Sequence, residues 1–310
     1  MTVWALLFLS FLCLTLGRTV SARLNIAGYF KDRAADHYLA KAGVQAAIQV
    51  LNDDQTQYDS LNDAWSDNEI LFKDVNLPTG KYSVSYRSPQ LKYGLTDEER
   101  KININTASED TLTALLVIAG CPDPEADQLA SCIIDWRDED SEPLTGGAED
   151  IYYNSLSVPY SCKDAGFQSP EELLLVKGMN DEIFSKIKDK ITVFGDGGVN
   201  INTAGKDVLC AIGMGAALAE KIGNYRLGPD GQEATSDDSS FESLENITEK
   251  LSLTESETEI INSLKASRLI AVASNNFKVA SRGSVINGTA SSEIICIIGR
   301  DGVIKYWHQN

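Results

Sequence analysis

The first fifty residues carry one unbroken helical pattern, and this pattern limits the folds open to the chain. Between Val3 and Leu16 almost every side chain is apolar, and the first charged residue is Arg18. Small and apolar residues then recur at spacings of three and four, the helical period: Leu24, Ala27, Ala34, Tyr38, Leu39, Ala42, Gly43, Ala46 and Ala47. The first proline is Pro78. The sequence therefore predicts a helix over residues 1–52, about 75 Å long at about 1.5 Å per residue, half in lipid and half on a folded body.

A cleaved signal peptide is the alternative for this stretch. The apolar run is somewhat short for a membrane span, which needs about 20 residues. Val20-Ser21-Ala22 is typical of a small-residue cleavage site, but no basic segment precedes the apolar run in the sequence. Cleavage after Ala22 would also cut a continuous helical pattern. We therefore favour a retained anchor that passes the membrane once.

Composition bounds the function of the rest. The 310 residues leave room for one large or two ordinary domains beyond the stem. A net charge of -18 argues against a general nucleic-acid binder, which needs a basic footprint, and suits solubility or divalent cations. His37 and His308 are the only histidines, so a Ser-His-Asp set or a histidine-rich metal site is hard to build. We expect no enzyme.

Cysteine spacing excludes zinc-finger and thioredoxin-like chemistry. Cys13 lies in the apolar run, and none of the other five cysteines forms a CxxC pair. In a body outside the cytoplasm, one or two disulfides are expected to form, with Cys162 pairing with Cys121 or Cys132.

Two separated regions predict strands of one sheet. Tyr82, Val84 and Tyr86 alternate with serines, as in a half-buried strand. Apolar strands are also expected around Phe277–Val285, Ile294–Ile298 and Val303–Trp307, with Gly299-Arg300-Asp301-Gly302 as a hairpin turn. We expect an α+β fold. Residues 53–100 and 266–310 form one small antiparallel domain packed on the stem, and residues 101–265 are a helical insertion.

The insertion contains an internal repeat. Ile102-Asn103-Ile104-Asn105-Thr106-Ala107 recurs as Val199-Asn200-Ile201-Asn202-Thr203-Ala204, each copy before a helical run. The Asn-Thr pairs are expected to form a turn and an N-cap before those helices. Gly213-Met214-Gly215 is typical of a helix-hairpin-helix turn, and Leu173–Met179 resembles a third half-copy. Lys221 is the only Lys or Arg between Cys210 and Tyr225, so a structural hairpin is favoured over phosphate binding.

Two acidic segments are the candidate metal sites. Residues 135–153 crowd carboxylates that are costly to hold together unless they are solvated or bind a cation. Calcium takes roughly six to eight oxygen ligands from such loops, and we name as candidates Asp135, Asp138, Asp140, Glu142, Glu149 and Asp150. A second loop, residues 228–238, offers Asp230, Asp237 and Asp238 at a spacing unlike that of an EF-hand. The alternative in both places is a solvated acidic loop.

Several of these segments together carry a family resemblance. The stem resembles the N-terminal helix of type IV pilins and pseudopilins, and Ala5 stands where most members have glutamate. The leader peptide of those precursors is absent, so the sequence is expected to start either at the mature residue or at a trimmed start. Asp135-Trp136-Arg137-Asp138, Gly147-Ala148-Glu149-Asp150 with Tyr152-Tyr153, and the helix 169–179 resemble the minor pseudopilin K family of type II secretion systems. Absence of that glutamate is also a feature of family K.

The resemblance implies a fold, a cofactor and partners. Family K proteins insert a large helical domain into a pilin-like α/β domain and bind calcium. They cap the pseudopilus together with the minor pseudopilins I and J, which supports protein export across the outer membrane. It also implies a single-pass inner-membrane protein with a periplasmic body. Competence DNA receptors share the Asn-Ile-Asn-Thr-Ala opening and the hairpin, so a membrane-anchored or secreted DNA-binding protein is the alternative.

Overall fold

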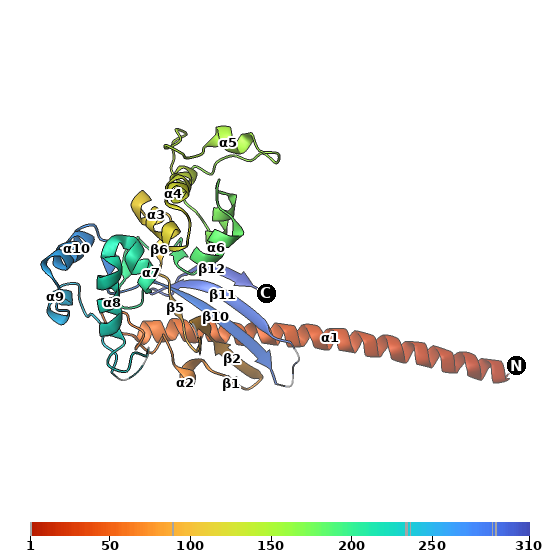
Figure 1. The fold of residues 1–310 in the computed structure, drawn as a ribbon. Coiled ribbons are helices and arrows are strands. Elements are labelled where there is room, and N and C mark those ends of the chain that lie inside the picture. Colours follow the sequence, from red (N-terminus) through yellow and green to blue (C-terminus); the bar gives the residue numbers. More distant parts are fainter. Residues whose placement is uncertain (1, 89, 233–234, 236, 287, 289) are drawn as a thin grey trace.

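One long helix projects from the body of the computed structural model, which describes residues 2–88, 90–232, 235, 237–286, 288 and 290–310. This helix, α1 (Thr2–Asp53), confirms the predicted stem, of which Met1 lies outside the described residues. Its N-terminal half extends away from everything else (Figure 1), and it is the one described helix long and apolar enough to cross a membrane. Only its C-terminal part is buried, through Asp36, Leu39, Ala40, Gly43, Val44, Ala47 and Leu51.

An antiparallel sheet packs on that buried part of α1. The strand order is β1 (Val75–Leu77), β2 (Gly80–Val84), β10 (Asn276–Val285), β11 (Ser292–Gly299) and β12 (Ile304–Gln309), and β5 (Thr96–Asp97) pairs with β10. Phe277, Val279 and Ser281 of β10 are buried, whereas Lys278 between them is exposed. A Cβ on Gly43 would lie 2.2 Å from Ser281 Oγ, so glycine sets the close approach of helix and sheet. The predicted union of the Tyr82 strand with the C-terminal strands is confirmed.

The strand predicted through Tyr86 is shorter than expected. Ser85 still donates its amide to Ala280 O, but the chain then leaves β10. Tyr86–Ser88 (β3) pairs instead with Gln90–Lys92 (β4), and Pro89 between them lies outside the described residues. Pairing between neighbouring segments replaces the continued ladder.

The insertion has a hydrophobic core of its own, separate from the core under the sheet. After the short helix α2 (Glu69–Phe72) and the first strands, its helices are α3 (Glu109–Ile118), α4 (Asp123–Arg137), α5 (Asp150–Asn154), η1 (Pro170–Leu175), α6 (Asp181–Ile187), α7 (Lys206–Leu209), η2 (Cys210–Met214), α8 (Gly215–Arg226), α9 (Ile247–Lys250) and α10 (Glu255–Ala266). Two parallel bridges join β6 (Ile102–Asn103) to β7 (Ile191–Thr192) and β8 (Val199–Asn200) to β9 (Ile270–Ala271). The predicted α+β fold with a helical insertion is thus observed.

The repeated hexapeptide builds the same local structure twice. Asn103 and Asn200 each accept the amide hydrogen two residues ahead in an Asx turn. In the first copy the side chain of Asn105 exchanges two hydrogen bonds with the backbone of Phe167, and Asn202 does the same with Phe241 in the second.

Each copy also accepts hydrogen bonds from one arginine, which lies at the end of α4 in the first copy and at the end of α8 in the second. Arg137 donates to the carbonyls of Ile104 and Ala107, and Arg226 donates to those of Ile201 and Ala204. The predicted cap position was wrong, because Ser108 and Gly205 are the N-cap residues and the Asn-Thr pairs serve these turns instead. Assignment of the hairpins to the helix-hairpin-helix class stays a prediction.

All six cysteines lie among the described residues, and all six are free thiols. The expected disulfide of Cys162 is therefore not observed. Cys162 Sγ donates to Asp135 O, and Cys132 Sγ donates to Gly146 O, so each thiol has a backbone partner instead.

Candidate functional site

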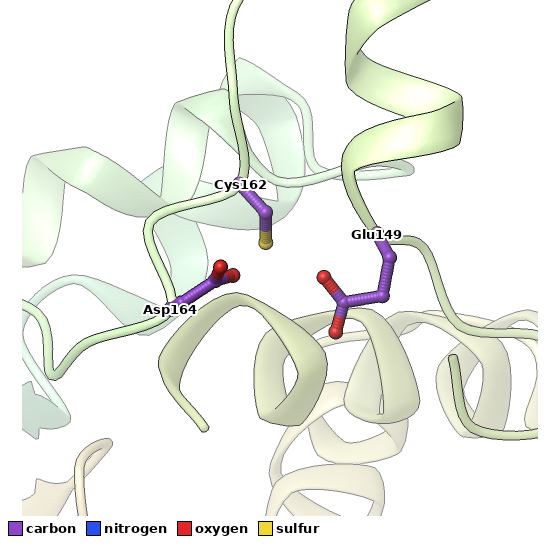
Figure 2. Close-up of side chains that lie close together, drawn as sticks. All are labelled: Glu149, Cys162 and Asp164. Carbon is purple, nitrogen blue, oxygen red and sulfur yellow. The ribbon is translucent and has the colours of Figure 1, made fainter. Parts of the chain in front are cut away.

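The first acidic segment folds around one buried carboxylate, Glu149, at the start of α5. Glu149 occupies the N-cap position of that helix, and Asp138 occupies the C-cap position of α4. Asp138, Asp140 and Glu149 offer oxygens within 4.8 Å of one another, and Glu149 also joins a second such group with Cys162 and Asp164. Figure 2 shows the Glu149 and Asp164 carboxylates and the Cys162 thiol converging from two loop segments. One carboxylate thus belongs to both groups.

Several oxygens at this place have no hydrogen-bond donor among the described residues. Glu149 is only 4% exposed, and neither of its side-chain oxygens has a hydrogen-bond partner. Asp138 Oδ1 and Asp164 Oδ1 are also buried and unpartnered. A buried carboxylate without a donor costs free energy, so these oxygens require either a proton or a cation. Oxygen donors of this kind suit a hard cation such as calcium.

Burial and crowding change the protonation of these groups. Burial, followed by the charges of Asp135, Asp164 and Asp138, raises the pKa of Glu149 to about 7. Burial and the neighbouring Asp140 also raise the pKa of Asp138. Burial raises the pKa of the Cys162 thiol to about 12, so this sulfur lines the group as a neutral thiol. The carboxylates, rather than the thiol, are the groups that could hold calcium here.

Two other predicted ligands hold the surrounding loops in place. Asp135 is fully buried at the end of α4, and its oxygens accept the amide hydrogens of Leu144 and Ala148 at 3.1 and 2.7 Å. A Cβ on Gly147 would lie 1.9 Å from Asp135 Oδ2, so glycine is needed for this loop to close. Asp150 Oδ1 accepts the amide hydrogen of Cys162 at 2.8 Å, which ties the two loop segments together.

The sequence prediction and the geometry overlap in three residues. Asp138, Asp140 and Glu149 lie together, whereas Asp135, Glu142 and Asp150 belong to neither group. Asp164 was missed. Asp164 lies in the loop after α5, beyond the acidic segment. Its φ of 48° is left-handed, and the sequence Asp-Ala-Gly at this position is a turn signal that could have pointed to it.

The second acidic loop also gathers its predicted residues. Asp230, Asp237 and Asp238 offer oxygens within 4.8 Å of one another, while Glu233, Ala234 and Ser236 of this loop lie outside the described residues. The Thr235 hydroxyl and the Asp230 amide donate to Asp237, and these bonds lower the pKa of the Asp237 carboxyl. Asp230 is exposed, Asp237 and Asp238 are half-buried, and the oxygens of all three have donors, so this geometry fits a solvated turn as well as a cation site.

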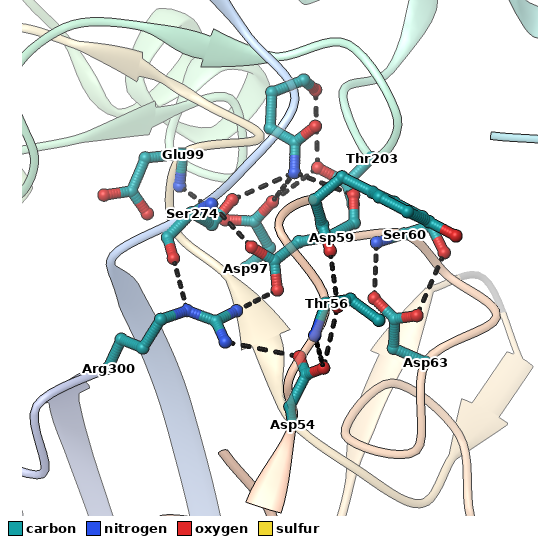
Figure 3. Close-up of polar contacts among 12 residues, drawn as sticks. Asp54, Thr56, Asp59, Ser60, Asp63, Asp97, Glu99, Thr203, Ser274 and Arg300 are labelled. Atoms are coloured by element: carbon teal, nitrogen blue, oxygen red, sulfur yellow. Dashed lines mark hydrogen bonds and ion pairs between the residues drawn. The ribbon is translucent and has the colours of Figure 1, made fainter. Parts of the chain in front are cut away.

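A third group of carboxylates joins the two cores, and no sequence motif predicted it. Asp54 and Asp59 both pair with the guanidinium of Arg300, and Asp59 also accepts the Ser274 amide hydrogen (Figure 3). Together with Asp63 these two carboxylates form a compact acidic group, in which Arg300 supplies the positive charge. Burial raises the pKa of Asp59 to about 7.

We call the contacts of Asp54, Asp59 and Asp63 around Arg300 the joint. Two further buried carboxylates extend it toward the second hexapeptide. Asp97 accepts hydrogen bonds from Thr203 and Asn200 of the second hexapeptide, and Glu99 accepts two from Asn276 at the start of β10. Burial, followed by the nearby Asp97 charge, raises the pKa of Glu99 to about 7. The end of α1, the insertion and the sheet therefore meet in one buried polar network.

The hairpin around α8 does not present a basic surface. Lys221 Nζ pairs with Glu257 at 2.7 Å, and Lys206 Nζ pairs with Glu220 at 3.0 Å. Gly213 and Gly215 both have positive φ angles, 99° and 71°, as the predicted turn requires. With its lysines paired, the hairpin fits a structural role better than phosphate binding.

Comparisons with known proteins agree with this geometry. Residues 91–196 match the family model described as Type II secretion system (T2SS), protein K. The chain is similar to Type II secretion system protein K of Klebsiella pneumoniae, with 28% identity over 128 residues, 36% of this chain and 39% of that protein. The protein of the same name from Aeromonas hydrophila is 34% identical over 93 residues, 29% of this chain and 28% of that protein. Each alignment thus spans well under half of the relative.

The fold comparison extends over nearly the whole chain. A chain in the crystal structure of the GspK-GspI-GspJ complex from the enterotoxigenic Escherichia coli Type 2 Secretion System matches with a TM-score of 0.67 and 20% identity, covering 94% of this chain and 99% of that one. Over residues 91–196, which include the acidic segment that suggested it, the family model confirms the resemblance to the protein K family. The structural match shows that the fold is shared over nearly the whole chain.

Proposed function

We propose that this chain is a minor pseudopilin of a type II secretion system, of the K kind. It caps the tip of a pseudopilus together with I-type and J-type minor pseudopilins, nucleates assembly of the filament and supports protein export across the outer membrane. The fold match over 94% of the chain is the observation that carries this proposal, and the protein K family match over residues 91–196 supports it. The role is structural rather than enzymatic.

The form of the molecule supports an anchored cap. The exposed half of α1 is apolar and passes the inner membrane once, which leaves the body in the periplasm. The buried half of α1 carries a sheet and an insertion far wider than the stem (Figure 1). Because this bulk would clash with a subunit stacked above it, the chain fits one copy at the filament end.

Complementation of secretion tests the proposal. In the native host, deletion of the gene should leave type II substrates in the periplasm, and the full chain should restore them to the medium. A chain without the apolar residues 2–23 should fail to restore secretion, because its body would not be held at the filament. Normal secretion in the deletion strain would contradict the proposed function.

The same proposal includes a calcium ion on the Glu149 groups. Glu149, Asp138, Asp140 and Asp164 are the residues that would hold it, since their unpartnered oxygens converge there. When bound, the cation would supply the positive charge that this acidic crowd needs. Asp135 and Asp150 would keep the loops in register around it through their amide bonds. The loop with Asp230, Asp237 and Asp238 is a second, weaker candidate.

A further inference from the structure

A cleft lies between the sheet and the helical insertion, on the face of the sheet opposite α1. Its floor is formed by β10 and β11 residues that point away from the stem, including Lys278, Ala280 and Ile295, and its far wall begins at Gly205 before α7. The cleft encloses about 700 Å³. A second hollow of about 470 Å³ continues it toward β12 and shares Lys101, Asp189, Lys278 and Ile295 with it.

Positive charge is concentrated along this cleft. Seven Lys and Arg residues line the two hollows against four Asp and Glu residues, whereas the whole chain has 27 basic and 45 acidic residues. Glu98 pairs with Lys101 and Asp207 pairs with Lys190, so these pairs cancel, and Lys206 pairs with Glu220 outside the lining. The positive excess therefore comes from the basic side chains that make no ion pair within the described chain. Within a protein of net charge -18, the cleft is a local site of attraction for anionic groups.

Three of the exposed basic side chains have no partner among the described residues. Arg87 on β3, Lys188 after α6 and Lys278 on β10 make neither an ion pair nor a side-chain hydrogen bond with the described part of the chain, and all three are exposed. They come from both domains, so their charges border the cleft from both sides. An occupant with carboxylates at its edges would give each of them a partner.

Around Lys278 the floor is apolar and follows the pleat of the sheet. Ala280, Ile295 and Ile297 alternate with buried residues that face α1, so their side chains point into the cleft. An extended peptide also alternates its side chains, with one face able to lie on this floor while the other reaches the basic rims. A chain of phosphates carries a charge at every unit and has no apolar side chains to place on this floor.

We propose that this cleft binds a short, extended acidic segment of a partner protein, with its apolar side chains on the sheet and its carboxylates on Arg87, Lys188 and Lys278. The inference rests on the cleft alone and does not depend on the proposed place in the pseudopilus. It assigns the outer face of the sheet a binding role separate from the cation groups and from the stem.

Fluorescence anisotropy tests the proposal with the full chain in detergent micelles. The probe is a fluorescein-labelled peptide of alternating glutamate and valine, nine residues long, and its glutamine-for-glutamate counterpart is the neutral control. We expect saturable binding of the acidic probe that weakens with salt. Double substitution Arg87→Glu with Lys278→Glu should weaken it at least about tenfold, and Lys188→Glu should weaken it separately. Lys250→Glu, an exposed change on α9 away from the cleft, should leave binding unchanged.

Three results would overturn the proposal. One is the absence of saturable binding by the acidic probe to the wild-type chain. Another is equal weakening by Lys250→Glu, which would mean that overall charge rather than the cleft attracts the peptide. The third is tighter binding of a single-stranded DNA nonamer than of the peptide, which would make the cleft a nucleic-acid site. Thermal melting of each variant shows whether it is folded. The double variant changes the sheet side of the cleft and Lys188→Glu changes the insertion side, so each still tests the proposal if the other does not fold.

Discussion

At the scale of single residues, Glu149 concentrates the chemistry of the acidic segment. The side chain of a helix N-cap residue normally accepts a backbone amide hydrogen, but the Glu149 side chain makes no such bond. Both of its oxygens are buried and have no hydrogen-bond partner. Burial, followed by the neighbouring carboxylates, raises its pKa to about 7. The residue is therefore suited to exchange a proton for a cation near neutral pH.

Calcium binding by the full chain should depend on pH in a defined direction. Below about pH 7 Glu149 is protonated and calcium must displace that proton, so affinity should rise from pH 5.5 to pH 8 and protons should be released on binding. Calorimetry in two buffers of different ionisation enthalpy measures both quantities. Glu149→Gln should remove the binding and the calcium-dependent rise in Tm, whereas Glu139→Gln, an exposed change in the same loop, should preserve them. A pH-independent affinity, or binding that survives Glu149→Gln, would contradict the assignment.

Glu99 in the joint makes a second prediction. Because its pKa is raised to about 7 from an ordinary 4.5, the folded chain keeps a proton that the unfolded chain loses between these values. Its contribution to the free energy of unfolding is therefore largest at low pH and falls as pH rises through 7. Glu99→Gln removes this titration, so the variant should gain about 1–3 kcal/mol relative to wild type between pH 5 and pH 8.

Urea unfolding at several pH values measures this difference. Glu249→Gln on α9 is the control, because Glu249 is exposed and should leave the pH profile of stability unchanged. A Glu99→Gln profile parallel to that of wild type would show that Glu99 is ionised throughout in the folded chain.

At the scale of elements, the turn before α8 explains why two glycines lie close together. Gly213 has a φ of 99° and Gly215 a φ of 71°, so both adopt a conformation that a Cβ disfavours. A Cβ at Gly213 would meet no atom within 4 Å, so the cost of substitution there is conformational rather than steric.

A matched pair of alanine substitutions separates these causes. Gly213→Ala should lower the free energy of unfolding by about 1–2 kcal/mol, because only the left-handed backbone opposes it. Gly223→Ala lies within α8, also with open space around it, and should raise the free energy of unfolding by up to about 1 kcal/mol. Chemical denaturation measures both. Equal effects of the two substitutions would mean that the turn is not under this conformational constraint.

Local patterns predicted most elements, because they depend on residues close together in the sequence. The 3.6-residue period located α1, alternation and the Asp-Gly turn located β10, β11 and β12, and the repeated hexapeptide located the start of each helical unit. The caps were misplaced, since the roles of Asn105 and Asn202 depend on Phe167 and Phe241, which lie far along the chain.

The candidate site was predictable only in part for the same reason. Crowded carboxylates pointed to Asp138, Asp140 and Glu149, but nothing in local spacing shows that Asp164 would fold back beside Glu149. The joint is a stronger case, because Arg300 reaches Asp54 and Asp59 across more than 200 residues. Such pairs follow from the tertiary fold and not from a motif.

At the scale of the whole molecule, two hydrophobic cores share one joint, and among the described residues α1 contributes buried side chains to only one of them. The sheet and the C-terminal part of α1 form the first core, and the insertion forms the second. The exposed N-terminal half of α1 has no partner within the described chain and is free to pack in lipid and among other stems. A membrane-anchored cap of a filament requires such an arrangement, in which the exposed half of α1 serves as the anchor and the folded body serves as the cap.

Native mass spectrometry of the full chain, co-expressed with I-type and J-type minor pseudopilins of the same system and released from detergent, tests this account most directly. The account predicts a complex that contains one copy of each of the three proteins. A chain that stays monomeric beside its co-expressed partners, or that assembles with several copies of itself in place of them, would contradict its place at the tip.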